Sequence, residues 1–191
     1  MDIDLIIKTL NEEGKVIAIK TDTVYGLICN AFDQKAIDKI YDIKKRERKK
    51  PLSIFIKNID ELDKFVERRN LSKEIFDILN KYWPGALTVI FKKKNDTFDY
   101  FLNGLDTIGI RIPNDETLLN ILNQINFPLA ETSCNISNEK EYKTAEEIRD
   151  KLGDKLDLIV DGGDVNNNIP STIVSVVNNE IITLRHGEID V

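Results

Sequence analysis

The sequence predicts an α/β domain with a twisted sheet that mixes parallel and antiparallel strands and carries helices on its faces. Two observations predict this class. Short apolar segments alternate with segments of helical periodicity through most of the chain, which is typical of crossover connections between parallel strands. Near the end of the chain, residues 172–177 and 181–185 flank Asn178-Asn179-Glu180, and this turn chemistry predicts an antiparallel hairpin.

The composition is that of an ordinary globular protein. The chain has 191 residues, of which 41% are hydrophobic and 31% charged, and a chain of this size buries roughly 70% of its unfolded surface. We find no internal repeat and no low-complexity linker, so residues 1–191 are expected to form one domain. No stretch approaches a membrane span and the acidic N-terminus lacks a signal-peptide pattern, so a cytoplasmic protein is expected.

Cysteine and histidine are scarce, which excludes several kinds of site. Cys29 and Cys134 are far apart and His186 is the only histidine, so neither a disulfide framework nor a zinc site is expected. Cys134 precedes Asn135, which superficially offers a Cys/His/Asn set with His186. A lone cysteine in such a turn is more typical of a buried filler than of a nucleophile.

The first elements follow from periodicity and capping residues. Residues 4–13 are expected to form an amphipathic helix that ends at Gly14, and residues 16–19 an apolar strand. Asp33 is a plausible N-cap for a helix that ends in the basic run 44–50.

The same patterns predict the remaining elements. Strands are expected at residues 52–56, 86–91, 107–112, 128–132 and 156–160. Helices are expected at residues 60–67, 72–82 and 115–125, and after the capping box that Thr144 begins with Glu147. Residues 92–104, KKKNDTFDYFLNG, are expected to form a mobile loop.

The basic run is the most unusual local feature. Residues 44–50 read KKRERKK, although the chain has a net charge of −6. Cations near a helix C-terminus need no ligand, because they interact favourably with the helix dipole. So much positive charge in an acidic chain also predicts a site for an anion. The sequence contains neither GxxxxGK[ST] nor GxGxxG, so the two common phosphate loops are excluded.

Polar segments adjoin the predicted strands in one order along the chain. They are KTDTVYGL at 20–27, the basic run with KPL, WPGALT at 83–88, IRIP at 110–113, TSCN at 132–135, STI at 171–173 and LRHG at 184–187. Each alone is typical of a turn. Together they resemble the YrdC-like threonylcarbamoyl-AMP synthase family in its short, single-domain form. The chain departs from the family pattern at Lys20, Lys45, Glu47, Cys134 and His186.

The resemblance implies a fold with a large concave cationic cavity, and it implies roles for particular residues. Lys44, Arg46 and Lys50 are expected to hold a triphosphate and to serve catalysis, with Mg²⁺ beside it. ATP is further expected to contact Thr23, Tyr25, Asn135, Thr144 and Arg185. The amino acid L-threonine is expected to contact Thr21, Arg111, Ser133 and Ser171, with the Arg111 guanidinium holding its carboxylate in two-toothed fashion.

The implied reaction condenses L-threonine, bicarbonate or CO₂, and ATP to threonylcarbamoyl-adenylate and pyrophosphate, for the threonylcarbamoyladenosine modification of tRNA. A nucleotidyltransferase of this kind needs positioning and electrostatics rather than a protein nucleophile. The expected partner is a tRNA threonylcarbamoyltransferase that receives the product, with a weak contact to RNA also allowed.

Several alternatives stay open at this stage. Tyr25 suits the core as well as a nucleotide, and Asp22 suits an Asx cap as well as a metal. Lys45 and Lys49 suit a solvated surface. The whole chain also suits an RNA-binding module, or a carbamoyl-transfer domain like those inside larger hydrogenase-maturation proteins.

Overall fold

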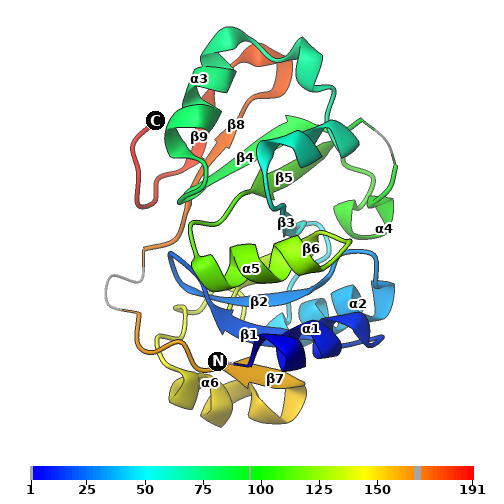
Figure 1. Cartoon of the computed structure of the whole chain (residues 1–191), viewed down its shortest axis with the longest axis vertical. Helices are drawn as coiled ribbons and strands as arrows, with labels where there is room; N and C mark the ends of the chain where they lie inside the picture. The colour runs from blue at the N-terminus through cyan, green and yellow to red at the C-terminus, as the bar shows by residue number, and fades with distance from the viewer. Residues whose placement is uncertain (1, 95, 166–168) are drawn as a thin grey trace.

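The computed structural model describes residues 2–94, 96–165 and 169–191 of the chain. In this part of the chain, nine strands form one mixed sheet in the order β7-β1-β2-β6-β3-β5-β4-β8-β9 (Figure 1). The strands are β1 Ile17–Lys20, β2 Tyr25–Asn30, β3 Ser53–Phe55, β4 Leu87–Lys92, β5 Thr107–Arg111, β6 Leu129–Ser133, β7 Leu158–Val160, β8 Thr172–Ser175 and β9 Ile182–Arg185. The pairs β1·β7, β3·β5 and β4·β8 are parallel and the other pairs antiparallel, so the predicted mixed sheet is confirmed.

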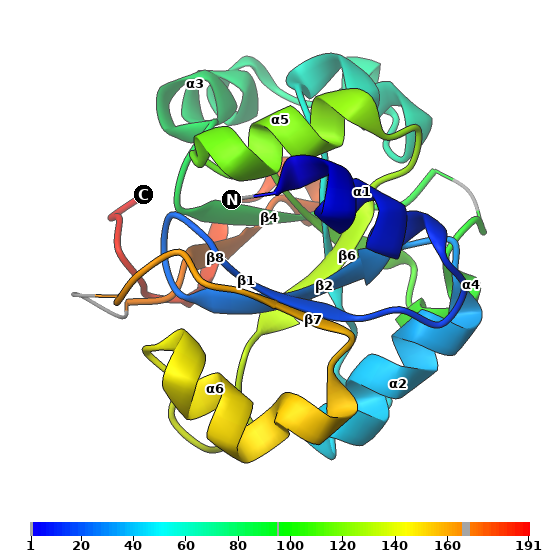
Figure 2. The same cartoon turned by 60° about the horizontal axis from the view of Figure 1, so that its bottom comes forward.

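Helices lie on both faces of the sheet. They are α1 Ile3–Asn11, α2 Gln34–Lys44, α3 Lys73–Tyr82, α4 Asp99–Leu102, α5 Glu116–Gln124 and α6 Ala145–Leu152. Figure 2 shows α1 and α5 together on one side of the central strands, with α2 and α6 on the other. None of these described helices has the length and apolar character that a bilayer crossing requires.

Capping side chains fix where the helices begin. The side chains of Asp33, Asp115 and Thr144 accept hydrogen bonds from Ala36 N, Leu118 N and Glu147 N, so these predicted starts are confirmed. At the other end of α2, Lys45 adopts a left-handed conformation with φ +50°. The helix therefore stops inside the basic run, and the remaining cations lie in the turn that follows.

The apolar side chains form one core cluster on each side of the sheet. One cluster packs α1 and α5 against Ile17, Ile28 and Leu129. The larger cluster includes Ile37 and Ile40 of α2, Ile148 of α6 and most of the other buried apolar residues. Because successive side chains of a strand point to opposite faces, Glu131 and Ser133 share the face of Leu129. A polar stretch of this face continues beyond the apolar one.

Three sequence-based expectations about the elements were wrong. The sequence predicts no strand at β2, because residues 20–27 have the pattern of a polar turn, although Gly26 to Cys29 are buried between β1 and β6. The predicted mobile loop 92–104 contains α4, which buries Phe98, Phe101 and Leu102 against the larger core; Asn95 lies outside the described residues. The predicted helix 60–67 is a 3₁₀ helix, Ile59–Lys64. The predicted hairpin is confirmed as β8 and β9, and its turn holds Asn178 and Asn179 at positive φ.

Candidate active site

A cavity lies over the central strands, with about 830 Å³ of empty space including the part open to solvent. Its walls come from segments that are far apart in the sequence. The lining comprises Thr21, Thr23, Val24, Gly26, Arg46, Pro51, Leu52, Ser53, Thr88, Ile90, Gly109, Arg111, Glu131, Thr132, Ser133, Pro170, Ser171, Ile173 and Arg185.

The floor of the cavity is a row of side chains across four neighbouring strands. Glu131 of β6 lies opposite Ser53 of β3, Ser53 opposite Gly109 of β5, and Gly109 opposite Ile90 of β4. A methyl group on Gly109 would lie 3.2 Å from the Ser53 Cβ atom. Small residues at this point therefore keep the floor low and leave room for a ligand.

One wall is a hydrogen-bonded network around Arg111. Its guanidinium donates to Gly85 O (2.9 Å), to Thr23 Oγ1 (3.1 Å) and to Asp22 Oδ1 (2.6 Å). Thr21 Oγ1 lies 3.1 Å from Thr23 Oγ1 and 2.7 Å from Val24 O. Arg111 is only 3% exposed. Within the described residues, three of its five N–H groups thus have a partner, which leaves two for a ligand.

The facing wall is built from Ser171 and Arg185. The Arg185 guanidinium donates to Ser171 O (2.8 and 3.1 Å) and to Ser171 Oγ (3.2 Å), while Ser171 Oγ lies 2.8 Å from Thr88 Oγ1. The hydroxyl of Thr172 next to it accepts from Gly187 N and donates to Ile189 O. The turn after β9 is thereby tied to β8, and Arg185 is held over the cavity.

A third network lies behind the cavity at the turn after β6. The Lys44 ammonium donates to Ser133 O, to Asn135 O (2.9 Å) and to Asn135 Oδ1 (2.6 Å). Ser133 Oγ also donates to Asn135 Oδ1, at 2.8 Å. Burial, and then repulsion from Arg46, lower the pKa of Lys44 to about 8. Lys44 therefore holds the shape of the turn that presents Ser133 to the cavity.

Positive charge in the cavity comes from three guanidinium groups. The Arg46 guanidinium donates to Lys50 O (2.8 Å) and Pro51 O (3.0 Å). These two bonds hold the side chain against the backbone at the end of the basic run. Burial lowers the pKa of Arg46, and Arg185 lowers it further; burial likewise lowers the pKa of Arg185, with a contribution from Arg111. The guanidinium groups therefore repel one another, which makes the charged form of each less favourable. An anionic ligand bound among them would relieve this repulsion.

The buried polar side chains of the molecule concentrate here. Across residues 2–94, 96–165 and 169–191, the buried polar or charged residues are Thr21, Thr23, Lys44, Thr88, Arg111, Thr132, Asn135, Ser171 and Thr172. Each lines the cavity or belongs to one of the networks behind it. Because buried polar groups are rare without a reason, their concentration marks this cavity as the functional site.

The structure separates the sequence-predicted site residues into two groups. Seven of them line the cavity, namely Thr21, Thr23, Arg46, Arg111, Ser133, Ser171 and Arg185. The other five lie outside its lining. Of these, Lys44 and Asn135 belong to the turn behind it, and Lys50 Nζ reaches Asn138 Oδ1 at 3.3 Å. Thr144 caps α6.

The structure shows the partners of Tyr25 and Asp22, two residues for which the sequence left more than one role open. The Tyr25 ring is fully buried, and its hydroxyl accepts from Gly162 N (3.1 Å) and donates to Gly163 O (3.0 Å). It therefore fastens the Asp161-Gly162-Gly163 loop to β2. Asp22 accepts from Arg111 and from Asn114 N (3.0 Å), which commits both carboxylate oxygens to the protein.

Two residues of the cavity floor escaped sequence reasoning. Glu131 and Ser53 line the cavity, and Ser53 Oγ donates to Glu131 Oε1 at 2.5 Å. The available signal was Glu131 itself, an acidic residue that follows the apolar pair Leu129-Ala130 and directly precedes TSCN. A charge inside a buried strand pattern has either a partner or a function.

Comparisons with known proteins identify the family of this chain. The family model for Sua5, YciO and YrdC, described as "Telomere recombination", matches residues 9–187. A protein of Methanocaldococcus jannaschii is 40% identical over 178 residues, which cover 93% of this chain and 82% of that protein. The threonylcarbamoyl-AMP synthase of Bacillus subtilis is 33% identical over 181 residues, 94% of this chain and 52% of that protein.

A solved structure extends the comparison to a ligand. The crystal structure of Pyrococcus abyssi Sua5 complexed with L-threonine superposes with a TM-score of 0.88 at 30% identity. The match covers 97% of this chain and 54% of that one, so the chain spans about half the length of the Bacillus and Pyrococcus proteins. The family model matches nearly the whole sequence, and the fold matches a solved structure of the same family. The chain therefore belongs to the Sua5/YciO/YrdC family.

Proposed function

We propose that this chain is a threonylcarbamoyl-AMP synthase. It would convert L-threonine, bicarbonate and ATP into threonylcarbamoyl-adenylate, pyrophosphate and water, with CO₂ as the species that meets the amine. One observation carries the proposal: Arg46, Arg111 and Arg185, distant in sequence, line a single cavity together with hydroxyl groups. Family relatives named for this activity and the threonine complex of Pyrococcus abyssi Sua5 support it.

The charges of the site suit the anions of this reaction. Arg46 and Arg185, whose pKa values burial lowers, would hold the triphosphate and oppose the charge that develops on the leaving pyrophosphate. Lys44 would act from behind, by keeping Ser133 and the adjoining turn in place. We propose nucleotide contacts beyond the cavity lining for Lys50, Asn135 and Thr144. Tyr25, which is fully buried, would support the site only by holding the loop at Gly162 and Gly163.

The amino acid would lie against the Thr21 and Ser133 side of the cavity. Arg111 has two N–H groups left after its internal bonds, enough for a two-toothed contact with a carboxylate. Ser171 would add a hydroxyl from the facing wall. Holding the carbamate oxygen in line with the α-phosphorus is then a matter of positioning.

Mg²⁺ would come with the nucleotide. In the described part of the chain no group of three or more His, Cys, Asp or Glu side chains could hold a metal ion. Mg²⁺ commonly keeps several waters and binds substrate phosphates with one or two carboxylates. The proposal therefore assigns this ion to phosphate oxygens and water, and its role is to offset phosphate charge.

We further propose that residues 1–191 act as one domain in the cytoplasm and pass the adenylate to a tRNA threonylcarbamoyltransferase. An RNA-binding module is the competing function. The location of the arginines favours the synthase, because they line a concave cavity and do not form a flat basic face on the surface.

The test is to incubate purified protein with ATP, Mg²⁺, bicarbonate and single amino acids, and to measure pyrophosphate and the adenylate adduct. L-Threonine should give both products, and omission of bicarbonate should stop adduct formation. Absence of pyrophosphate under all conditions, together with salt-sensitive RNA binding that ignores ATP, would show that the proposed reaction is wrong.

A further inference from the structure

Glu131 stands apart from the other charged residues of the cavity. Within the described residues, the lining of the cavity contains three arginines and one carboxylate, that of Glu131. The resemblance of motifs assigns no role to position 131, since the motif begins at Thr132. Glu131 nevertheless belongs to the floor, at one end of the row that continues through Ser53, Gly109 and Ile90.

The Glu131 carboxylate accepts a hydrogen bond but forms no ion pair with the described residues. Ser53 Oγ donates to Oε1 at 2.5 Å. Within the part of the chain that the structure describes, no lysine or arginine nitrogen lies within 4.0 Å of either carboxylate oxygen. Glu131 is still near enough to raise the pKa values of Lys44, Arg46 and Arg185, against the lowering by burial. A gap thus separates the negative group from the positive ones.

This arrangement is complementary to a zwitterion. A carboxylate that served only to balance the guanidinium charges would contact one of them, because a direct ion pair is the favourable geometry for two partly buried charges. Here the carboxylate and the three guanidinium groups line one cavity, and no ion pair joins them within the described residues. An α-amino acid carries a carboxylate and an ammonium on neighbouring atoms, and it would complete both halves at once.

We infer that Glu131 binds the α-ammonium group of the amino acid and so selects substrates with a free primary amine. The inference rests on the proposed function and deepens it. Oε1 keeps its bond from Ser53, and the other oxygen accepts from the ammonium. Ser53 acts as a positioning residue, because its hydroxyl fixes the orientation of the carboxylate.

Mg²⁺ is the other cation that one carboxylate could attract. The surroundings favour the ammonium, because a divalent ion at Glu131 would lie among Arg46, Arg111 and Arg185 without further acidic ligands in the described lining. A monovalent ammonium meets less repulsion there, and it brings its own anionic carboxylate for the guanidinium groups.

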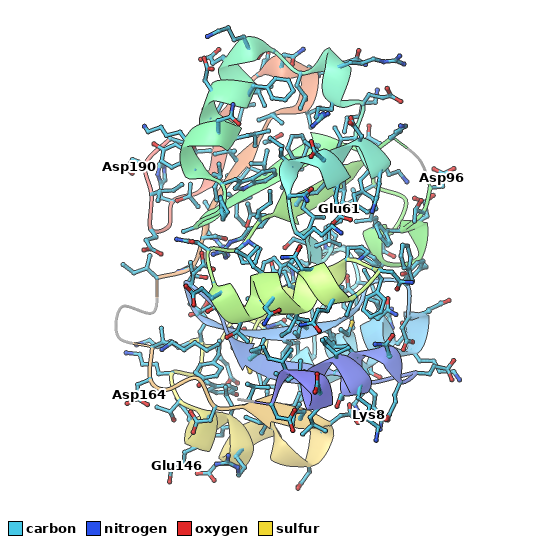
Figure 3. All side chains as sticks on the ribbon, viewed as in Figure 1. Lys8, Glu61, Asp96, Glu146, Asp164 and Asp190 are labelled. Carbon is cyan, nitrogen blue, oxygen red and sulfur yellow. The ribbon has the colours of Figure 1, made fainter. Side chains whose placement is uncertain are left out.

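The experiment measures L-threonine binding by calorimetry, with ATP present, for the wild-type chain, Glu131→Gln and Glu146→Gln. Glu146 is an exposed residue of α6 that projects away from the fold, which makes it a matched control (Figure 3). We expect Glu131→Gln to weaken threonine binding on the order of ten- to a hundredfold, the scale of a hydrogen bond to a charged group, and Glu146→Gln to leave it unchanged.

A threonine analogue without the amino group tests whether Glu131 acts on the amine. In 2,3-dihydroxybutanoate a hydroxyl replaces the amino group and the rest of threonine is kept. The wild-type chain should bind it much more weakly than threonine, and Glu131→Gln should bind it no more weakly than the wild type does. If Glu131→Gln does not fold, as judged by circular dichroism, the wild-type comparison of the two ligands decides: equal affinities overturn the inference.

Three further outcomes would overturn it. Unchanged threonine affinity in Glu131→Gln shows that the carboxylate does not meet the ammonium. An equal loss for both ligands shows a structural role. A raised Mg²⁺ requirement for pyrophosphate release, with threonine affinity unchanged, assigns Glu131 to the metal. Failure of the proposed function looks different, because the wild-type chain itself would then bind no threonine and release no pyrophosphate.

Discussion

Arg111 and Asp22 form a buried ion pair, 2.6 Å between Nη2 and Oδ1, that joins the end of β5 to the turn after β1. The side chains are 3% and 11% exposed. The second oxygen of Asp22 accepts from Asn114 N, so one carboxylate ties the turn after β1 both to Arg111 and to the segment that follows β5. This pair fixes the Arg111 guanidinium relative to Thr23.

Asp22→Asn should therefore destabilise the fold. The substitution keeps the shape of the side chain but leaves a buried guanidinium without its counter-charge, and we expect a loss of about 3 kcal/mol in the free energy of unfolding. Urea unfolding measures it. The control is Asp38→Asn, which breaks the exposed pair with Arg48 and should cost less than about 1 kcal/mol. Equal costs for the two variants would contradict a structural role for the Asp22 pair.

Arg46→Glu should abolish pyrophosphate release while the protein stays folded. The guanidinium of Arg46 lines the cavity, and charge reversal there would repel a triphosphate. The same substitution two residues later, Arg48→Glu, changes an exposed side chain outside the described lining and should leave turnover near the wild-type value. Normal ATP turnover in Arg46→Glu would show that this arginine does not hold the nucleotide.

The rate of adenylate formation should fall as pH rises through about 8. Below this pH Lys44 is an ammonium whose three hydrogens match the oxygens of Ser133 and Asn135; above it the amine lacks the charge that holds this turn. The pH–rate profile measures the effect. Lys44→Arg, which keeps its charge, should remove the decline, and a decline at the same pH in that variant would assign it to another group.

The contribution of Lys44 to stability should change in the opposite direction. Its pKa in the folded chain lies below the usual lysine value, so the unfolded chain binds more protons between about pH 8 and that value. Stability from this group therefore increases over the interval in which activity declines. Urea unfolding at several pH values separates the two effects; a parallel loss of stability would indicate alkaline unfolding instead.

Gly187→Ala should destabilise the wall that carries Arg185. A methyl group at Gly187 would lie 2.2 Å from Pro170 O and 2.5 Å from Ser171 C, and backbone atoms cannot yield as a flexible side chain does. We expect a cost of about 1–3 kcal/mol, typical of overpacking, measured by urea unfolding. Gly153→Ala is the control, because its methyl group would meet only Arg149 Cγ at 3.5 Å. A neutral Gly187→Ala would show that this turn can shift.

Much of the fold was accessible from the sequence because local signals agreed with the tertiary structure. Asp33, Asp115 and Thr144 cap helices where the pattern placed them, and the asparagine-rich turn closes β8 onto β9. Strand β2 was missed because its start overlaps a polar motif and its pairing is long-range. Helix α4 was missed because a lysine-rich stretch conceals Phe98 and Phe101, whose burial depends on the larger core.

The site was predicted less evenly than the fold. Motif order indicated the three arginines, and they do line one cavity. Spacing along the chain does not distinguish a side chain that enters a cavity from one that supports it, so Lys44 and Tyr25 were assigned to the ligand although their bonds hold turns and loops. Glu131 could not be recognised from a motif, because its significance arises only when β6 pairs with β3.

The position of β6 between β2 and β3 has a consequence for biosynthesis. The lining is drawn from Thr21 through Arg185, and the strand that contributes Glu131 to the floor is inserted between two that are translated long before it. A nascent polypeptide consequently has no ligand affinity until almost all of these residues have left the ribosome, and small molecules cannot assist its early collapse.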